Sequence, residues 1–246
     1  MFSSSPFLIA LQFLTVIPVR IEEPDNEATG CSLLYYPLVG LLIGLLLEMI
    51  GWMGSGMPSN LHAAVVLTFW VVITGALHLD GLADSADAWI GGLGDPKKTI
   101  AIMKDPCCGP VAVVTLVLVL LIKFTALAHI LTIGYLEVLV LAPVLGRTAL
   151  VMLFLTTPYV RPNGLGTLLS NHLPRRTSLV IILFTFATVP LFMGIAALWL
   201  LIALAGTFIV LRALMLKRID GTTGDTAGAL VEMTETIMLL AAILIE

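Results

Sequence analysis

Three aspartates lie close together in the segment 78–89, which reads HLDGLADSADAW. At about 100° of rotation per residue in an α-helix, Asp80, Asp84 and Asp87 fall within an arc of roughly 60° on one helix face. Carboxylates held this close repel one another, and their desolvation is costly. A cation between them would remove the repulsion, and Mg²⁺ commonly joins carboxylates to substrate phosphates. The alternative is a solvated acidic helix start, where aspartate is favoured.

A second acidic set follows the glycine-containing segment 221–224. Asp225, Gly228, Glu232 and Glu235 have a 3-4-3 spacing, which places them on one helix face within roughly 80°. Gly228 leaves room there for the close approach of another helix or of a ligand. Glu232 and Glu235 enter an otherwise uncharged hydrophobic segment, where acids are costly and are functional candidates. The alternatives are snorkelling acids at a helix end and an N-cap role for Asp225, which does not exclude metal binding.

Two acidic helix faces that converge would hold one or two Mg²⁺ ions. Such a site fits transfer at a phosphate, because metal ions neutralise phosphate oxygens and position the attacking and leaving groups. The predicted metal ligands are Asp80, Asp84, Asp87 and Asp225. The attacking hydroxyl also needs a general base, for which the candidates are His78, Glu232 and Glu235. In a continuous helix His78 would face away from Asp80, so a histidine bonded to backbone at a helix end is the alternative.

Basic side chains in three stretches could hold an anionic substrate. Lys104 lies beside a rigid proline turn. Arg147 follows a glycine within a hydrophobic segment, where it needs an anionic partner or a polar cavity. Arg161 lies in a glycine-containing loop. For the other loop cations we prefer the interpretation that they signal membrane topology. The predicted substrate-binding residues are Lys104, Arg147, Arg161 and Gly228.

The composition indicates a membrane protein. Of the 246 residues, 59% are hydrophobic and 11% are charged, whereas soluble domains have about 25% charged residues. We therefore predict an all-α, polytopic transmembrane helical bundle that forms a single domain over residues 1–246. The net charge of −4 argues against a nucleic-acid partner. The three cysteines have no zinc-site spacing, and adjacent Cys107 and Cys108 do not indicate a disulfide framework.

Hydropathy predicts about seven membrane spans. Residues 6–19 are apolar but too short to span, so we expect an interfacial or re-entrant segment there, and the N-terminus lacks the basic region of a signal peptide. A turn at Pro190 and Gly194 divides the long uncharged run 179–211 into two helices. The expected spans are 33–53, 61–79, 109–131, 136–157, 178–193, 195–215 and 227–245.

The loops between these spans differ in charge. Those on one side contain most of the Lys and Arg residues, whereas 54–60, 132–135 and the C-terminus contain none. The positive-inside rule places the first set in the cytoplasm and the C-terminus on the opposite side. The long loops and the polar motifs all fall on the cytoplasmic side. This asymmetry, together with the lack of an inverted repeat, favours an enzyme that works at that face over a transporter.

Together these residues resemble the cobalamin synthase family, the adenosylcobinamide-GDP ribazoletransferases. The resemblance runs along most of the chain, and the order and joint presence of its short motifs make it specific. The motifs are 13–19 (FLTVIPV), 36–40 (YPLVG), 78–87, 104–106 with Gly109 and Pro110, Gly146 with Arg147, Arg161 with Gly164 and Gly166, and 223–225 with Gly228, Ala229 and Glu232.

The resemblance implies a Mg²⁺-requiring enzyme of the prokaryotic cytoplasmic (inner) membrane. Such an enzyme joins adenosylcobinamide-GDP to α-ribazole, or to its 5′-phosphate, releases GMP and completes the nucleotide loop of cobalamin. Its substrates are small molecules, and membrane lipid surrounds it. A homo-oligomer and a complex with other cobalamin-assembly enzymes are both compatible with this chain.

The acidic segment is also distantly similar to the CDP-alcohol phosphotransferases, whose paired acidic motifs bind metal. This chain has Asp84 after Ala83, where an arginine is expected in that family, which weakens the comparison for residue roles. A lipid synthase of that type is therefore one alternative function. A cation-coupled transporter that uses the intramembrane acids is an alternative from a different class.

Overall fold

The computed structural model describes residues 5–21, 25–162 and 164–245, and within those ranges it contains helices and no β-strand. An isolated bridge joins Tyr159 to Thr222. One isolated bridge does not make a strand, so the helices of the described chain confirm the predicted all-α class. In chain order the elements are α1 (Pro6–Leu14), α2 (Asn26–Ser32), η1 (Leu33–Tyr35), α3 (Tyr36–Met53), α4 (Ser59–Ile73), α5 (Leu77–Gly91), α6 (Pro96–Ile102), α7 (Pro110–Ile133), α8 (Glu137–Thr156), α9 (Leu165–Asn171), α10 (Arg175–Met193), α11 (Ala196–Ile219) and α12 (Gly224–Leu244).

Six segments of the described chain are long and apolar enough to cross a membrane. The first runs through α2, η1 and α3 as Asn26–Met53, and the others are α7, α8, α10, α11 and α12. The pair α4 and α5 passes the same test only when taken together, with a bend of 86° between the two helices. Taken as one span, this pair would be the seventh. With six or seven candidate spans, the predicted polytopic helical bundle is confirmed.

The break between α4 and α5 corrects the predicted span 61–79. α4 ends at Ile73, and Gly75 and Ala76 follow with φ values of +60° and +55°. Two consecutive left-handed residues cannot continue a right-handed α-helix. The freed carbonyl of Ile73 accepts a hydrogen bond from the N–H of Val16 at 2.9 Å. The chain therefore starts a new helix at Leu77, in a different direction, just before the acidic segment.

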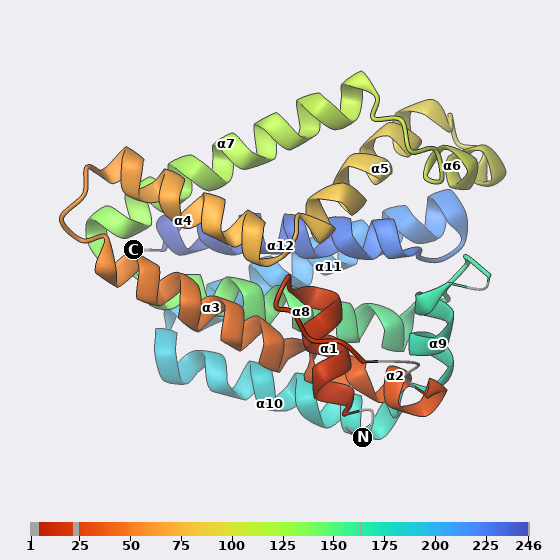
Figure 1. Cartoon of the computed structure of the whole chain (residues 1–246), viewed down its shortest axis with the longest axis horizontal. Coiled ribbons are helices and arrows are strands. Elements are labelled where there is room, and N and C mark those ends of the chain that lie inside the picture. Colours follow the sequence, from red (N-terminus) through yellow and green to blue (C-terminus); the bar gives the residue numbers. More distant parts are fainter. Residues whose placement is uncertain (1–4, 22–24, 163, 246) are drawn as a thin grey trace.

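The connections between the long helices lie at two opposite ends of the bundle (Figure 1). Segments 92–109, 157–162 with 164–174, and 220–223 lie at one end, which we call the basic end because Lys97, Lys98, Lys104 and Arg161 are there. Segments 54–58, 134–136 and 194–195 lie at the other end with residue 245, and none contains Lys or Arg. The separation of charge predicted from the sequence is thus present in the folded chain.

Three short helices are too short to span a membrane. α6 and α9 have 7 residues each and belong to the basic end. α1 has 9 residues and packs against α2 and α3. Its length agrees with the short N-terminal segment expected from the sequence, and its position at the membrane interface stays a prediction.

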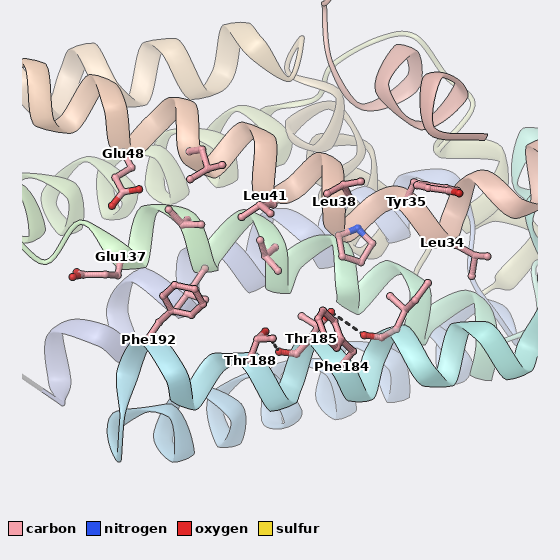
Figure 2. A pocket seen from close by; sticks show the side chains of 16 residues that line it. Leu34, Tyr35, Leu38, Leu41, Glu48, Glu137, Phe184, Thr185, Thr188 and Phe192 are labelled. Atoms are coloured by element: carbon pink, nitrogen blue, oxygen red, sulfur yellow. Dashed lines mark hydrogen bonds between the residues drawn. The ribbon is translucent and has the colours of Figure 1, made fainter. Parts of the chain in front are cut away.

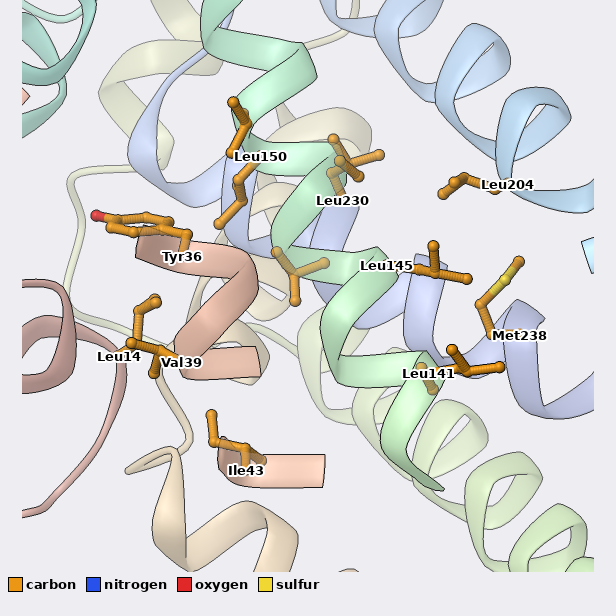
Figure 3. Packing of buried hydrophobic residues seen from close by; sticks show 14 of the residues in the cluster. Leu14, Tyr36, Val39, Ile43, Leu141, Leu145, Leu150, Leu204, Leu230 and Met238 are labelled. Carbon is orange, nitrogen blue, oxygen red and sulfur yellow. The ribbon is translucent and has the colours of Figure 1, made fainter. Parts of the chain in front are cut away.

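α8 is the central helix of the bundle. In its most apolar 18-residue stretch, 83% is buried inside the protein, compared with 22–28% for α7, α10 and α11. Gly40 and Gly44 allow α3 to approach it closely, because a Cβ on Gly40 would lie 2.6 Å from the carbonyl oxygen of Pro143. Figure 3 shows α8 side chains between those of α3 on one side and those of α11 and α12 on the other; the labelled residues include Val39, Ile43, Leu141, Leu145, Leu204, Leu230 and Met238.

Two further glycines bring α5 against the start of α12. A Cβ on Gly81 would lie 2.6 Å from the carbonyl oxygen of Asp225, and a Cβ on Gly228 would lie 3.4 Å from the Cα of His78. Of the two roles that the sequence left open for Gly228, the close approach of another helix is therefore present. The two acidic segments, far apart in sequence, meet at this contact.

We expect Gly81→Ala to destabilise the protein, because the added methyl group would collide with backbone that has no flexible side chain to move. Overpacking of this kind costs about 1–3 kcal/mol. Thermal unfolding of the purified protein in detergent would measure the loss. Gly206→Ala in α11 is the matched control, because a Cβ there meets nothing within 4 Å. Equal melting temperatures for the two variants would contradict the close helix contact.

Candidate active site

A cavity of about 280 Å³ lies where the start of α5, the start of α12 and the segment around Arg161 meet. We call it the polar cavity, because five of the predicted site residues line it, whereas the rest of its wall is largely aromatic and aliphatic. Those five are His78, Asp80, Arg161, Asp225 and Gly228. The structure therefore brings together residues from three of the motifs noted in the sequence.

The start of α12 is held by a capping box. Thr223 is the N-cap residue: its Oγ1 accepts from the N–H of Thr226 at 3.2 Å, and its own N–H donates to Thr226 Oγ1 at 2.9 Å. The N-cap role considered for Asp225 is therefore wrong. Because threonine satisfies the free amide groups at this helix end, the carboxylate of Asp225 is left available to the cavity.

Arg161 faces Asp225 across the cavity. Its Nη1 lies 3.3 Å from Asp225 Oδ2, a buried oxygen that makes no hydrogen bond within the described chain. The other guanidinium nitrogen, Nη2, donates to the carbonyl of Met103 at 3.4 Å. Lys104 follows Met103 and is exposed, so it lies beside the cavity rather than in its wall. An anion in the cavity would meet Arg161 first.

The loop that carries Arg161 is fixed to the residues before α12. Val160 N–H donates to the carbonyl of Thr222 at 2.9 Å, and Thr222 N–H donates to the carbonyl of Pro158 at 2.8 Å. Two backbone hydrogen bonds thus keep Arg161 next to Asp225. Sequence reasoning had no signal for this pairing, because the two segments are about sixty residues apart and neither is a strand.

The acidic face predicted on α5 exists, but its three carboxylates have different surroundings. Asp80 is exposed at the cavity, and Asp84 is partly buried and interacts electrostatically with Asp80, Asp225 and Arg161. Asp87 is turned toward α7 and caps its start: Oδ2 accepts from the N–H of Gly109 at 2.5 Å and Oδ1 from the N–H of Ala112 at 2.9 Å. These bonds leave the predicted metal role of Asp87 untested, since each oxygen keeps another lone pair.

Tyr159 is a cavity residue that the sequence analysis did not single out. Its ring stacks on Phe154 with centroids 6.0 Å apart, and Gly166 leaves the space that the ring occupies. Burial raises the pKa of Tyr159 above its usual value. The phenol therefore stays protonated at physiological pH, and its hydroxyl can donate a hydrogen bond into the cavity. Its position two residues before Arg161 was the available signal.

Behind the cavity lies a buried charge cluster, formed by Lys123, Arg147, Glu232 and Glu235. Lys123 Nζ lies 2.6 Å from Glu232 Oε1 and 2.9 Å from Glu235 Oε2, and Arg147 Nη1 pairs with Glu235 Oε1. Each of the four side chains is at most 6% exposed. Two positive and two negative charges balance one another, as the low dielectric of a membrane protein's interior requires.

The cluster shows where three predicted site residues lie. Glu232, Glu235 and Arg147 do not line the polar cavity. Arg147 has the anionic partner that its sequence position required, and the partner is Glu235. Sequence reasoning missed Lys123, although a lysine within a hydrophobic span is itself a signal for a buried acidic partner. Its Nζ also lies 4.4 Å from the centre of the Trp70 ring.

His78 connects the charge cluster to the cavity. Its Nδ1 lies 3.4 Å from Arg147 Nη2, and the same residue lines the cavity beside Asp80. The cavity wall includes both His78 and Asp80 at the start of α5, and the expected orientation of the His78 side chain away from Asp80 stays a prediction. A guanidinium can only donate, so Nδ1 is the acceptor, and a neutral ring then has its proton on Nε2.

The described residues contain no group of three or more His, Cys, Asp or Glu side chains close enough to hold a metal on their own. Mg²⁺ usually needs only one or two protein carboxylates, with water and substrate phosphates completing its shell. Asp80 and Asp225, which both line the cavity, fit that requirement, and Arg161 Nη1 lies 3.3 Å from Asp225 Oδ2. The arrangement can therefore receive a phosphate-bound cation between α5 and α12.

We expect Lys123→Met to destabilise the protein strongly, because it leaves Glu232 and Glu235 with a single buried cation. Breaking a buried ion pair costs about 3–5 kcal/mol. Thermal unfolding in detergent is the measurement, and exposed Lys217→Met is the matched control. Adding Glu232→Gln to Lys123→Met restores the charge balance and should recover much of the loss. A melting temperature like that of Lys217→Met would show that the cluster contributes nothing.

The comparisons with known proteins agree with one another. The family described as Cobalamin-5-phosphate synthase matches residues 6–243. A protein from Pseudomonas putida (strain W619), named Adenosylcobinamide-GDP ribazoletransferase, is 55% identical over 236 residues, which cover 96% of this chain and 97% of that protein. Proteins with the same name from Stutzerimonas stutzeri (strain A1501) and Pseudomonas syringae pv. syringae (strain B728a) are 54% and 52% identical, over 96% and 98% of this chain and 96% and 99% of their own.

No solved structure matches this chain. The family match covers nearly all of the sequence, and the relatives align from end to end at more than half identity. The chain belongs to the Cobalamin-5-phosphate synthase family.

Proposed function

We propose that this protein joins adenosylcobinamide-GDP to α-ribazole, or to its 5′-phosphate, and releases GMP. The observation that carries the proposal is the polar cavity, in which two carboxylates, a guanidinium and an imidazole from distant motifs face one space at the basic end. The relatives that align over nearly the full chain carry the name of this transfer activity, which supports the proposal. The product is adenosylcobalamin or its 5′-phosphate, so the reaction completes the nucleotide loop.

The reaction is a displacement at phosphorus. A ribose hydroxyl of the ribazole attacks the phosphorus on the cobinamide side of the diphosphate, a new P–O bond forms, and the bond to GMP breaks. The diphosphate brings negative charge into the cavity. Arg161 lies in the cavity wall to meet it, and Lys104 is exposed beside it. Both side chains would offset phosphate charge.

Mg²⁺ is the cofactor that these residues fit best. Asp80 and Asp225 would hold it from the two helices, with Asp84 close behind. Asp225 Oδ2 accepts no hydrogen bond within the described chain, although Arg161 Nη1 lies 3.3 Å away. When bound, the ion would neutralise the diphosphate oxygens. Asp87 would join the ligand set only through its remaining lone pairs, since both oxygens hold the start of α7. Gly228 provides the space for this approach of α5 to α12.

The candidate bases have separate roles in this proposal. Among them only His78 lines the cavity, whereas Glu232 and Glu235 belong to the charge cluster behind it. Glu235 holds Arg147, and Arg147 holds His78 Nδ1, so these residues position the ring. The ring then presents an N–H at Nε2, which would donate to a phosphate oxygen. The proton of the ribose hydroxyl would pass to a cavity carboxylate.

The charge of the loops supports an orientation in the cytoplasmic membrane. The positive-inside rule places the basic end, and with it the polar cavity, in the cytoplasm. The C-terminus would then lie on the other side. Substrates present in the cytoplasm would then reach the cavity without crossing the bilayer.

The native cysteines at the basic end allow a test of this orientation. Cys107 and Cys108 are exposed there, so a membrane-impermeant maleimide should label them in inside-out vesicles and not in intact spheroplasts. Ser55→Cys, combined with Cys107→Ser and Cys108→Ser, places a thiol at the opposite end and should give the reverse result. Labelling of Cys107 and Cys108 in intact spheroplasts would overturn the orientation.

The activity is tested with purified protein in lipid, supplied with adenosylcobinamide-GDP and α-ribazole or its 5′-phosphate. We expect GMP and corrinoid product in equal amounts with Mg²⁺ and neither with EDTA. Asp80→Asn and Asp225→Asn should each lower the rate of product formation by about 100-fold or more, because each removes a carboxylate proposed to bind Mg²⁺. Asp220→Asn, an exposed acid at the same end of the bundle, is the control and should keep full activity.

Two results would direct attention to the alternative functions. Product from CDP-diacylglycerol and an alcohol would favour a lipid synthase of the CDP-alcohol type. Cation flux in sealed vesicles without covalent product would favour a transporter. Under the proposed function CDP-diacylglycerol is inert and no flux occurs. Full transfer activity in folded Asp80→Asn would contradict the metal assignment while leaving the reaction itself intact.

A further inference from the structure

A long groove runs along the lateral face formed by α3, α8 and α10 (Figure 2). Its volume is about 540 Å³, and it shares no lining residue with the polar cavity. Residues such as Leu38, Leu41, Val144 and Phe184 form its wall. We call it the lateral groove. Nothing in the proposed transfer reaction uses it.

Between Tyr35 at one end and Glu48 and Glu137 at the other, the wall of the lateral groove offers almost no hydrogen-bonding groups. Its two threonines are already satisfied, since Thr185 Oγ1 donates to the carbonyl of Ile181 at 2.9 Å and Thr188 Oγ1 to the carbonyl of Thr185 at 2.7 Å. Leu38 and Phe184 are 47% and 70% exposed on this face. All three helices belong to segments able to span a membrane. In a bilayer such a groove is filled by hydrocarbon, and an acyl chain matches its apolar wall.

One end of the groove is acidic. Glu48 and Glu137 both line it, and Figure 2 shows them together at the same end. Glu137 is the first residue of α8, and Glu48 lies 5 residues before the end of α3, so both lie near the ends of membrane-spanning segments. Within the described chain neither carboxylate has a salt-bridge or hydrogen-bond partner among the contacts found. The loops at this end contain no Lys or Arg that could pair with them.

We propose that the lateral groove binds a phospholipid with a primary ammonium headgroup, of the phosphatidylethanolamine class. One acyl chain lies along the apolar wall, and the ammonium group lies between Glu48 and Glu137. A primary ammonium donates up to three hydrogen bonds, whereas a quaternary choline donates none. The site therefore prefers ethanolamine over choline headgroups, and it disfavours anionic glycerol headgroups by charge. It is separate from the transfer reaction and does not depend on it.

The test uses the full-length protein in nanodiscs of phosphatidylcholine that contain a minor fraction of phosphatidylethanolamine, and native mass spectrometry identifies the lipid retained after release. We expect one retained phosphatidylethanolamine, enriched about tenfold over its share of the bilayer. Glu48→Gln with Glu137→Gln should remove the enrichment but keep a retained lipid, because the apolar wall is unchanged. Asp220→Asn, an acid outside the groove, is the matched control and should retain the enrichment.

A second variant tests the groove itself. Leu41→Trp fills the groove and should abolish the retained lipid, whereas Val117→Trp on the exposed face of α7 should not. Thermal unfolding in detergent shows whether each variant is folded, independently of any activity. Equal retention of choline and ethanolamine lipids by the unmodified protein would overturn the proposal. A dimer that retains no lipid, and that Leu41→Trp converts to monomers, would show that a second copy covers this face.

Discussion

The charge balance among Lys123, Arg147, Glu232 and Glu235 constrains the rest of the structure. These side chains come from α7, α8 and α12, so the cluster determines how three helices are arranged around the bundle centre. A buried ion pair is weak evidence for stability, because desolvation offsets much of the attraction. Its value here is specificity: any other packing of the three helices would leave a charge unpaired in a medium without water. The same cluster reaches His78 through Arg147 and so links the packing to the polar cavity.

Small residues make this arrangement sterically possible. Gly40 and Gly44 bring α3 onto the backbone of α8, and Gly81 and Gly228 bring α5 onto α12. In a membrane the hydrophobic effect does not drive helices together, so close backbone approach and the dispersion contacts that it permits contribute more. The result places α8 and α12 inside and leaves the outer faces of α7, α10 and α11 to lipid. The lateral groove is a consequence of this division, because α3 and α10 meet α8 without closing over it.

The acidic residues divide into two groups according to what compensates them. Glu232 and Glu235 are neutralised by protein cations and face no cavity. Asp80 and Asp225 line the polar cavity, where Arg161 pairs with Asp225. Two carboxylates with one nearby cation leave a net negative charge in the cavity. A bound metal cation together with a substrate phosphate would complete the charge balance there. The same reasoning applied to Glu48 and Glu137 leads to a lipid ammonium group.

Local sequence determined the helices, the charge difference between the two ends and the common face of Asp80, Asp84 and Asp87, because hydropathy, loop composition and the 3.6-residue period are all read over short windows. Only the tertiary structure decided the partners: Asp87 with the start of α7, Lys123 with Glu232, and Arg161 with Asp225. The first two of these pairs are 22 and 109 residues apart. The break at Gly75 and Ala76 was also undecided, since glycine permits a left-handed conformation without requiring it. Periodicity places a charge on a helix face, but the element packed against that face determines what the charge does.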